Sequence, residues 1–204
     1  MTTISIIGSG NMAKVIGTRA RKHGHTIEIM GRDRAKAQAL ADQIGNGTSA
    51  GTFGQKPKGD IVILAVLYSG ALDVVAHYGD ALSDKILVDI TNPFNDDATG
   101  LVTTEGESAS QQIATAATGA HVVKALNTIF AGVLAEDKPM DAFLASDDVE
   151  AKARVATFLE SLNMRPLDVG GLEATYLLEW IGIFLVGLAR NGASFEIALG
   201  AGAL

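Results

Sequence analysis

Short apolar runs alternate with helical segments along most of this chain. The runs lie at residues 4–7, 26–30, 60–66, 86–90 and 121–126, with a weaker one at 48–50, and apolar residues at helical spacing fill residues 11–23, 34–44, 70–78 and 110–117. Strands that alternate with helices form βαβ units, in which parallel strands carry helices on both faces of the sheet. The sequence therefore predicts a doubly wound α/β fold with a mainly parallel sheet.

The pattern continues in shorter form toward the C-terminus. Strands are expected at residues 141–145 and 165–169, and helices at residues 149–162 and 173–189. We expect residues 1–139 to form the main α/β domain. Residues 140–204 are expected to form a small C-terminal α/β extension that packs on the same sheet, so that both parts make one structural unit.

Composition excludes several classes of protein. The 204 residues are 48% hydrophobic, carry a net charge of −7 and include no cysteine. An acidic chain lacks the basic surface that nucleic-acid phosphates require, so we expect no nucleic-acid partner. The N-terminus has no secretory pattern, and the most apolar late stretch, residues 180–189, is shorter than the roughly 20 residues of a membrane helix. We therefore expect a cytoplasmic protein with no membrane partner.

The histidines give no sign of a metal site. The chain has four of them, scattered along the sequence without the spacing of metal ligands, and no cysteine to complete such a set. His23 and His25 flank a glycine turn and are expected at the surface. No metal is predicted.

A glycine-rich turn, Gly8-Ser9-Gly10-Asn11-Met12-Ala13, joins the first strand to the first helix. It matches G-x-G-x-x-[G/A], the turn with which Rossmann-type domains bind the diphosphate of a dinucleotide. Gly8 permits the tight bend, Gly10 lets the diphosphate approach the backbone, and Ala13 lets the helix pack closely on the strand. Free amides and the helix dipole then attract the anion. We expect Gly8, Ser9, Gly10, Asn11 and Met12 to bind a dinucleotide in a Rossmann-type fold.

The end of the second strand distinguishes between the two common dinucleotides. NAD-binding domains place Asp or Glu there to bond the ribose hydroxyls, whereas this chain has Gly31 followed by Arg32. A guanidinium can hold a 2′-phosphate with two parallel hydrogen bonds, and Lys36 adds a second cation nearby. We therefore predict NADP(H), bound through Gly31, Arg32 and Lys36, and interpret Arg34 as an ordinary solvated residue.

Several segments together resemble one family, the NADP oxidoreductases that use the deazaflavin coenzyme F420. They are the glycine turn at residues 8–13, Val88-Asp89-Ile90-Thr91-Asn92-Pro93, Val122-Val123-Lys124-Ala125-Leu126-Asn127-Thr128, and the segment from Arg165 to Leu172. The same set is similar to the cytosolic reductase domain of the six-transmembrane metalloreductases. The resemblance spans nearly the whole chain.

The resemblance implies hydride transfer between NADPH and a deazaflavin or flavin-type acceptor, which would be a small-molecule partner. It also implies that the cofactor runs beyond the ends of the strands. The residues expected there are Ala65, Val66 and Leu67 after the fourth strand, and Asn92, Pro93, Asn127 and Thr128 near the nicotinamide. Direct hydride transfer needs aligned rings and excluded water rather than a side-chain acid, so no catalytic residue is assigned.

Three positions depart from the family pattern. Leu67 stands where a proline is expected, the loop at residues 129–133 lacks an arginine associated with deazaflavin binding, and Tyr176 replaces a more polar or basic residue. These departures concern the second cofactor and leave the NADP prediction intact. Leu67 and Phe130 are expected either in the core or on a wall of the acceptor site, which the apolar C-terminal tail would help to form.

Two other functions stay open. One is the reduction of a small imine or carbonyl substrate, although that chemistry usually needs a proton donor and none is evident. The other is a non-catalytic module that senses NADP. An NAD-type ribose contact also stays open, through Asp33 or Glu28.

Some side chains carry chemistry without a predicted role. Asp89 lies in an apolar strand and is expected to bond backbone or loop groups. Lys124 lies in another strand and has no assigned role. The segment Gly47-Thr48-Ser49-Ala50-Gly51 matches G-x-S-x-G, but no helix follows it directly as a nucleophile elbow requires, so no hydrolase chemistry is expected.

The helix expected at residues 173–189 is apolar over residues 181–188. Such a helix is suited to burial on several sides. It fits three roles: a core helix, a cover over the cofactor, or the interface of a homodimer.

Overall fold

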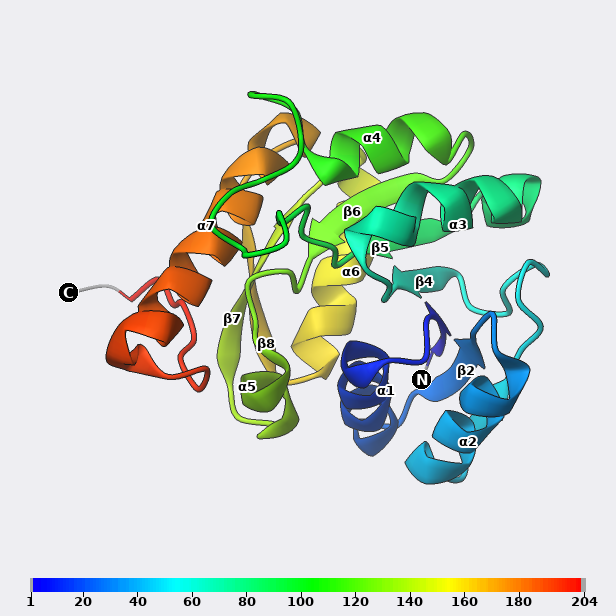
Figure 1. The fold of residues 1–204 in the computed structure, drawn as a ribbon. Helices are drawn as coiled ribbons and strands as arrows, with labels where there is room; N and C mark the ends of the chain where they lie inside the picture. The colour runs from blue at the N-terminus through cyan, green and yellow to red at the C-terminus, as the bar shows by residue number, and fades with distance from the viewer. Residues whose placement is uncertain (1, 203–204) are drawn as a thin grey trace.

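The computed structural model describes residues 2–202, which form one eight-stranded sheet between two layers of helices (Figure 1). The strands are β1 (Thr3–Ile7), β2 (Thr26–Met30), β3 (Thr48–Ala50), β4 (Ile61–Leu64), β5 (Ile86–Asp89), β6 (His121–Ala125), β7 (Met140–Ala145) and β8 (Met164–Asp168). Their order across the sheet is β3-β2-β1-β4-β5-β6-β7-β8. The predicted doubly wound α/β fold with a mainly parallel sheet is confirmed.

Within residues 2–202, six α-helices lie between strands and a seventh follows β8. They are α1 (Asn11–Lys22), α2 (Arg34–Ile44), α3 (Ala71–Tyr78), α4 (Ala109–Ala116), α5 (Ala131–Ala135), α6 (Val149–Ser161) and α7 (Thr175–Leu188). Short 3-10 turns lie at η1 (Tyr68–Gly70), η2 (Gly79–Leu82) and η3 (Leu172–Ala174), and the π-helical turn η4 (Ala189–Ala193) continues α7. Side-chain caps start several helices, among them a capping box at α4 in which Ser108 and Gln111 bond each other's backbone.

The strand order reverses between β1 and β4, because the chain winds outward from β1 to β3 and then returns to the middle of the sheet. In doubly wound sheets, ligands bind at the carboxyl ends of the two strands at such a point. All neighbouring strands are parallel except β6 and β7. Strands β7 and β8 thus extend the same sheet past β6 in the opposite direction.

Alternation of buried side chains fixes which face of the sheet each helix covers. In β4, Ile61 and Ile63 join the core that packs under α1, α2, α5 and α6, whereas Val62 and Leu64 join the core under α3 and α4. Figure 1 shows these two layers on opposite sides of the strands. Because β4 is buried on both faces, it forms the continuous apolar run seen in the sequence.

Three features differ from the sequence predictions. Helix α5 was not expected, because five residues are too few to show a helical period. His25 is buried rather than exposed, with Nε2 2.8 Å from Ser161 Oγ, and burial lowers its pKa. Among residues 2–202, one helical run, Leu172–Ala193, is long and apolar enough to cross a membrane, where the sequence suggested a shorter stretch. Of its most apolar window, 39% is buried inside the molecule.

Candidate functional site

The glycine turn lies at the switch point between β1 and β4. Gly8 has φ +132°, and a Cβ at this position would lie 2.1 Å from the carbonyl oxygen of Ala65, at the end of β4. Its amide also donates to the Met30 carbonyl at 2.9 Å. Gly8 is therefore required by the close packing of the strand ends themselves, whatever the site binds.

Gly10 has the opposite surroundings. It caps the N-terminus of α1 without a side-chain hydrogen bond, and a Cβ built on it meets no atom within 4 Å. Helix N-termini leave backbone amides without partners inside the helix, and an anion can accept from them. One turn further, Ala13 is fully buried against the sheet. The open backbone at Gly10 and the uncapped amides fit the diphosphate of a dinucleotide.

A pocket of about 350 Å³ lies beside this turn, between α1 and α2. It is lined by Ser9, Gly10, Asn11, Lys14, Lys36, Ala39, Leu40 and Gln43. The structure thus brings the predicted Lys36 to the turn, and it adds Lys14, which sequence reasoning missed. Lys14 follows Gly10 by four residues, so both lie on one face of α1, and that spacing was the available signal. Arg32 is exposed at the end of β2.

The acidic residues that would suit NAD are engaged elsewhere. Asp33 caps α2 by accepting a hydrogen bond from the Lys36 amide at 3.1 Å. Glu28 is buried in β2 and accepts from Ser5 Oγ at 2.7 Å and from the Lys58 amide at 2.9 Å. Glu28 is thus bonded inside the sheet and is not free to receive the ribose hydroxyls, which favours the NADP prediction, whereas the side chain of Asp33 is half exposed and its contact with a ribose stays open.

The segment after β4 passes directly over the switch point. Ala65 and Val66 are half-buried, whereas Leu67 is 82% exposed. Of the two roles predicted for Leu67, core packing is therefore wrong. Exposure of a large apolar side chain at this edge leaves it available as a wall for a bound ligand.

Beyond β5 and β6, two asparagines hold the loops together. Asn92 Nδ2 donates to the Asn127 carbonyl, and Asn127 Nδ2 donates to Asn92 Oδ1, both at 2.9 Å. Asn127 also donates to the Leu178 carbonyl of α7 at 2.9 Å. Pro93, Thr128 and Asn127 are buried and Asn92 is half-buried, so this part of the predicted site is a well-packed floor.

Leu126, between β6 and Asn127, has φ +61° although it is a bulky buried residue. The left-handed region is unfavourable for leucine, and such strain is concentrated at functional sites. Here the turn at Leu126 sends the chain sharply out of β6 and sets the position of Asn127.

Beneath these loops lies a buried charge cluster of Lys124, Asp89 and Glu179, all with fully buried side chains. Lys124 Nζ lies 3.0 Å from Asp89 Oδ2 and 3.0 Å from Glu179 Oε1. Asp89 also accepts from the Thr91 amide, as expected of it, and from Ser110 Oγ. Burial raises the pKa of Glu179, and the nearby Lys124 ammonium opposes that shift.

Sequence reasoning missed this cluster. Glu179 is the only charged residue in α7, and Lys124 interrupts an apolar strand. A buried charge requires a partner of opposite sign, so these two isolated residues were the signal for their pairing.

The C-terminal segment covers the loop after β6. Ile129 forms an antiparallel bridge with Ala198, and the ring of Phe130 packs edge-on against Phe195 with the centroids 5.1 Å apart. Phe130 is half-buried and Phe195 is 53% exposed. Phe130 is therefore in contact with the C-terminal segment, and its place on a wall of the acceptor site stays a prediction.

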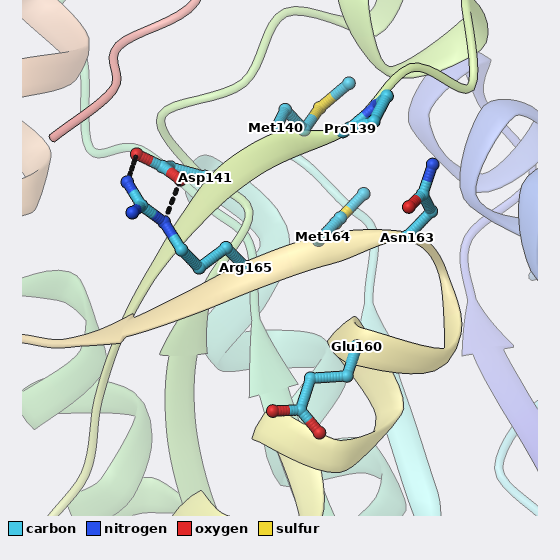
Figure 2. Close-up of a pocket in the computed structure, with 7 residues that line it drawn as sticks. All are labelled: Pro139, Met140, Asp141, Glu160, Asn163, Met164 and Arg165. Carbon is cyan, nitrogen blue, oxygen red and sulfur yellow. Dashed lines mark hydrogen bonds and ion pairs between the residues drawn. The ribbon is translucent and has the colours of Figure 1, made fainter. Parts of the chain in front are cut away.

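A second pocket, of about 400 Å³, lies at the other end of the sheet, where β7 and β8 begin (Figure 2). Figure 2 shows two of its polar groups paired with each other, since Arg165 Nε lies 2.7 Å from Asp141 Oδ1. Strands β4, β5 and β6 separate it from the glycine turn at β1. We therefore place the functional site at the smaller pocket beside that turn.

Comparison with known proteins agrees with this geometry. Residues 3–93 match the model of the family described as NADP oxidoreductase, coenzyme F420-dependent. The F420-dependent NADP reductase of Methanothermobacter thermautotrophicus is 27% identical over 204 residues, covering 91% of this chain and 88% of the relative. The solved structure of SMa0349, a hypothetical protein of Sinorhizobium meliloti, is 31% identical with a TM-score of 0.78, covering 86% of this chain and 88% of the other. The chain therefore resembles the F420-dependent NADP oxidoreductases, whose family model matches its N-terminal part.

Two further comparisons concern the fold and a second kind of reductase. A crystal structure from Arthrobacter sp. fb24, described as a candidate F420-dependent NADP reductase, superposes over the full length of both chains with a TM-score of 0.87 at 23% identity. Metalloreductase STEAP3 of Rattus norvegicus is 25% identical over 186 residues, and the match covers 37% of its length. The resemblance to both kinds of reductase is therefore confirmed, and the chain spans less than two fifths of the metalloreductases that it matches.

Proposed function

We propose that this chain binds NADP(H) and transfers hydride between NADPH and a deazaflavin or flavin-type acceptor. The observation that carries the proposal is the uncapped N-terminus of α1, where Gly10 leaves the backbone open beside a pocket with two lysines. The match of residues 3–93 to the family model supports NADP(H), and the exposed Arg32 offers a partner for a 2′-phosphate.

The residues of this chain bind, orient and exclude water. The α1 amides would hold the diphosphate, and Arg32 and Lys36 the 2′-phosphate. Leu67 and Phe130 would form apolar walls around the space where the nicotinamide and the acceptor ring meet. When bound, the reduced nicotinamide supplies the hydride, so the protein needs to align the rings rather than donate a proton.

Calorimetric titration tests the binding half of the proposal. NADPH should bind, and Gly10→Val should abolish binding while leaving the melting temperature nearly unchanged, because its side chain enters open space in the free protein. Gly8→Ala is the matched contrast and should damage folding, since its Cβ meets the Ala65 carbonyl. Absence of heat with both NADPH and NADH would refute the proposal.

Turnover with a panel of acceptors tests the catalytic half. We expect NADPH oxidation with a deazaflavin or a flavin, and slower or no oxidation with quinones, imines and carbonyls. Tight NADPH binding without turnover on any acceptor would instead identify a sensing module. Turnover with an imine alone would identify the reductase of a small substrate.

We also propose a homodimer formed through α7. Leu177, Trp180, Phe184 and Leu188 are 40–57% exposed and follow each other at spacings of three or four residues. They therefore form one apolar stripe along the helix. Asn127 donates a hydrogen bond to the Leu178 carbonyl of the same helix, so a dimer contact along this stripe would lie close to the loops proposed to hold the cofactor.

A further inference from the structure

The charge cluster under the β5 and β6 loops contains two carboxylates and only one cation. Lys124 uses all three of its N–H donors: it bonds Asp89 at 3.0 Å, Glu179 at 3.0 Å and the Thr91 carbonyl at 2.6 Å. An amine that donates three hydrogen bonds and accepts none has the arrangement of a charged ammonium. The cluster therefore holds one positive charge.

Both carboxyl groups are arranged as acceptors. Asp89 accepts from Thr91 N at 2.8 Å and from Ser110 Oγ at 2.6 Å, besides Lys124. Glu179 Oε1 accepts from the Ala109 amide at 3.0 Å. Ala109 is the first residue of α4, so the positive end of a helix also faces this carboxylate. Within residues 2–202 both groups have only donors as partners, an arrangement that satisfies two ionised carboxylates. Burial raises the pKa of Glu179, and Lys124 and the Ala109 amide oppose that shift by stabilising the ionised form. With both carboxylates ionised beside the ammonium, the cluster carries a net charge of −1.

This net charge lies below the expected position of the nicotinamide. Asp89 is the last residue of β5, and Lys124 is the residue before the last of β6. With the diphosphate at α1 and the adenosine toward Arg32, the nicotinamide half extends toward β4, β5 and β6. The bond from Lys124 to the Thr91 carbonyl joins the cluster directly to the residue before Asn92.

We propose that the Lys124–Asp89–Glu179 cluster makes the site favour the oxidised over the reduced cofactor. The nicotinamide ring of NADP⁺ carries a positive charge that the ring of NADPH lacks, while the rest of the two molecules is the same. A buried negative charge therefore attracts one form and leaves the other nearly unaffected. The inference rests on the proposed function, since it assumes that the ring lies at this edge.

The size of the effect follows from Coulomb's law. Two unit charges about 10 Å apart at an effective dielectric constant of about 20 interact strongly enough to change an affinity ratio on the order of tenfold. Favouring the oxidised form would make bound NADPH a stronger hydride donor. Lys124, Asp89 and Glu179 would then act as positioning and electrostatic residues that touch neither substrate nor product.

Affinities for both redox forms, measured by calorimetry on wild type and Glu179→Gln, test the proposal. Glutamine keeps an oxygen to accept from Lys124 and removes one negative charge. We expect NADP⁺ to bind about tenfold more weakly to this variant and NADPH to change less than twofold. If Glu179→Gln does not fold, Asp89→Asn removes one negative charge from the β5 side of the cluster. It should shift the ratio of the NADP⁺ and NADPH affinities in the same direction.

Two control variants separate charge from disturbance of structure. Ser110→Ala breaks a hydrogen bond of the same cluster without changing its charge, and Glu150→Gln removes a charge from exposed α6. Neither should change the ratio of the two affinities. Equal weakening of both forms by Glu179→Gln, or an unchanged ratio, would overturn the inference while leaving NADP(H) binding intact. Failure of both cofactors to bind wild type would instead refute the proposed function.

Discussion

At the scale of single residues, the two glycines of the turn differ in what requires them. Gly8 is fixed by the Ala65 carbonyl 2.1 Å from its missing Cβ, whereas Gly10 has open space above it. The motif in the sequence predicts both positions but cannot separate the structural glycine from the binding one. That distinction depends on β4, which lies about fifty residues further along the chain.

The choice of NADP over NAD is also made by single residues. Arg32→Ala should weaken NADPH binding by roughly 10- to 100-fold, because a hydrogen bond between two charged groups contributes roughly 1.5–3 kcal/mol. NADH binding should hardly change, since NADH lacks the 2′-phosphate. Calorimetry with both cofactors measures the two effects.

Arg34→Ala is the matched control for that variant. Arg34 is also exposed, and it begins α2 two residues after Arg32. It should leave both affinities within twofold of wild type. An equal loss of NADPH and NADH affinity in Arg32→Ala would show that Arg32 does not recognise the 2′-phosphate.

Leu126 makes a prediction about stability. Its φ of +61° costs roughly 1–2 kcal/mol for leucine and nothing for glycine. Leu126→Ala loses the buried side chain and keeps most of the strain, whereas Leu126→Gly loses the side chain and the strain together. Urea unfolding should therefore show both variants to be destabilised by about 2–5 kcal/mol, with the glycine variant the more stable.

The reference for that comparison is Leu87, a fully buried leucine in β5. In an ordinary strand glycine destabilises the fold relative to alanine, so Leu87→Gly should have a lower free energy of unfolding than Leu87→Ala. If Leu126 shows the same order as Leu87, its backbone carries no strain that affects folding.

At the scale of elements, periodicity predicted the strands and long helices to within a few residues. Apart from the short β3, the strands of the parallel part are short, mainly apolar runs, and the long helices repeat apolar residues every three or four positions. Helix α5 and the antiparallel direction of β7 were not predicted. Both depend on the path of the chain after β6, which is set by the strained Leu126 and by contacts with the distant Ala198.

The same limit applies to the site: residues close together in the sequence could be predicted, and residues that meet only after folding could not. The sequence predicted the turn, Arg32 and Lys36, because these residues lie within one βαβ unit; the structure brings Lys36 to the pocket beside the turn, and the role of Arg32 stays a prediction. The cluster of Lys124, Asp89 and Glu179 was not predicted, because its members come from β6, β5 and α7 and meet only after folding.

The end of α1 gives a pH prediction. Lys22 and His23 at this end lower the pKa of Asp137, after α5, to about 2. A carboxyl group with a lowered pKa stabilises the fold above its ordinary pKa near 4, and this contribution disappears as the pH falls toward 2. Asp137→Asn should remove this pH-dependent contribution to the free energy of unfolding, about 1 kcal/mol after solvent screening.

Urea unfolding at pH 7 and at pH 3 measures that contribution. Wild type should lose more stability between the two pH values than Asp137→Asn does. Asp96→Asn, at an exposed loop position, should behave like wild type. If Asp137→Asn lost as much stability as wild type, the ion pairs at Asp137 would not contribute to the fold.

At the scale of the whole molecule, the open question is which surface meets another chain. Most helices bury one face and expose polar residues, but α7 exposes Trp180 and Phe184 as well as burying Glu179. Phe184→Glu should convert a dimer into a monomer in sedimentation experiments, because a charge in an apolar interface has no partner.

The control places the same charge elsewhere. Val149, at the start of α6, is 76% exposed, and Val149→Glu should leave the assembly unchanged. A wild-type protein that sediments as a monomer at all concentrations would contradict the proposed homodimer without affecting the cofactor site.

The chain has one tryptophan, and it lies on the exposed stripe of α7. Its ultraviolet emission therefore reports on a single, known patch of surface. A blue shift of that emission at higher protein concentration would show that the indole loses contact with water, as it does when the stripe is covered by a second chain. Partial quenching of the emission by added NADPH would show energy transfer from the indole to a nicotinamide bound nearby. One built-in fluorophore can thus follow self-association and cofactor loading in the same cuvette, with no label attached.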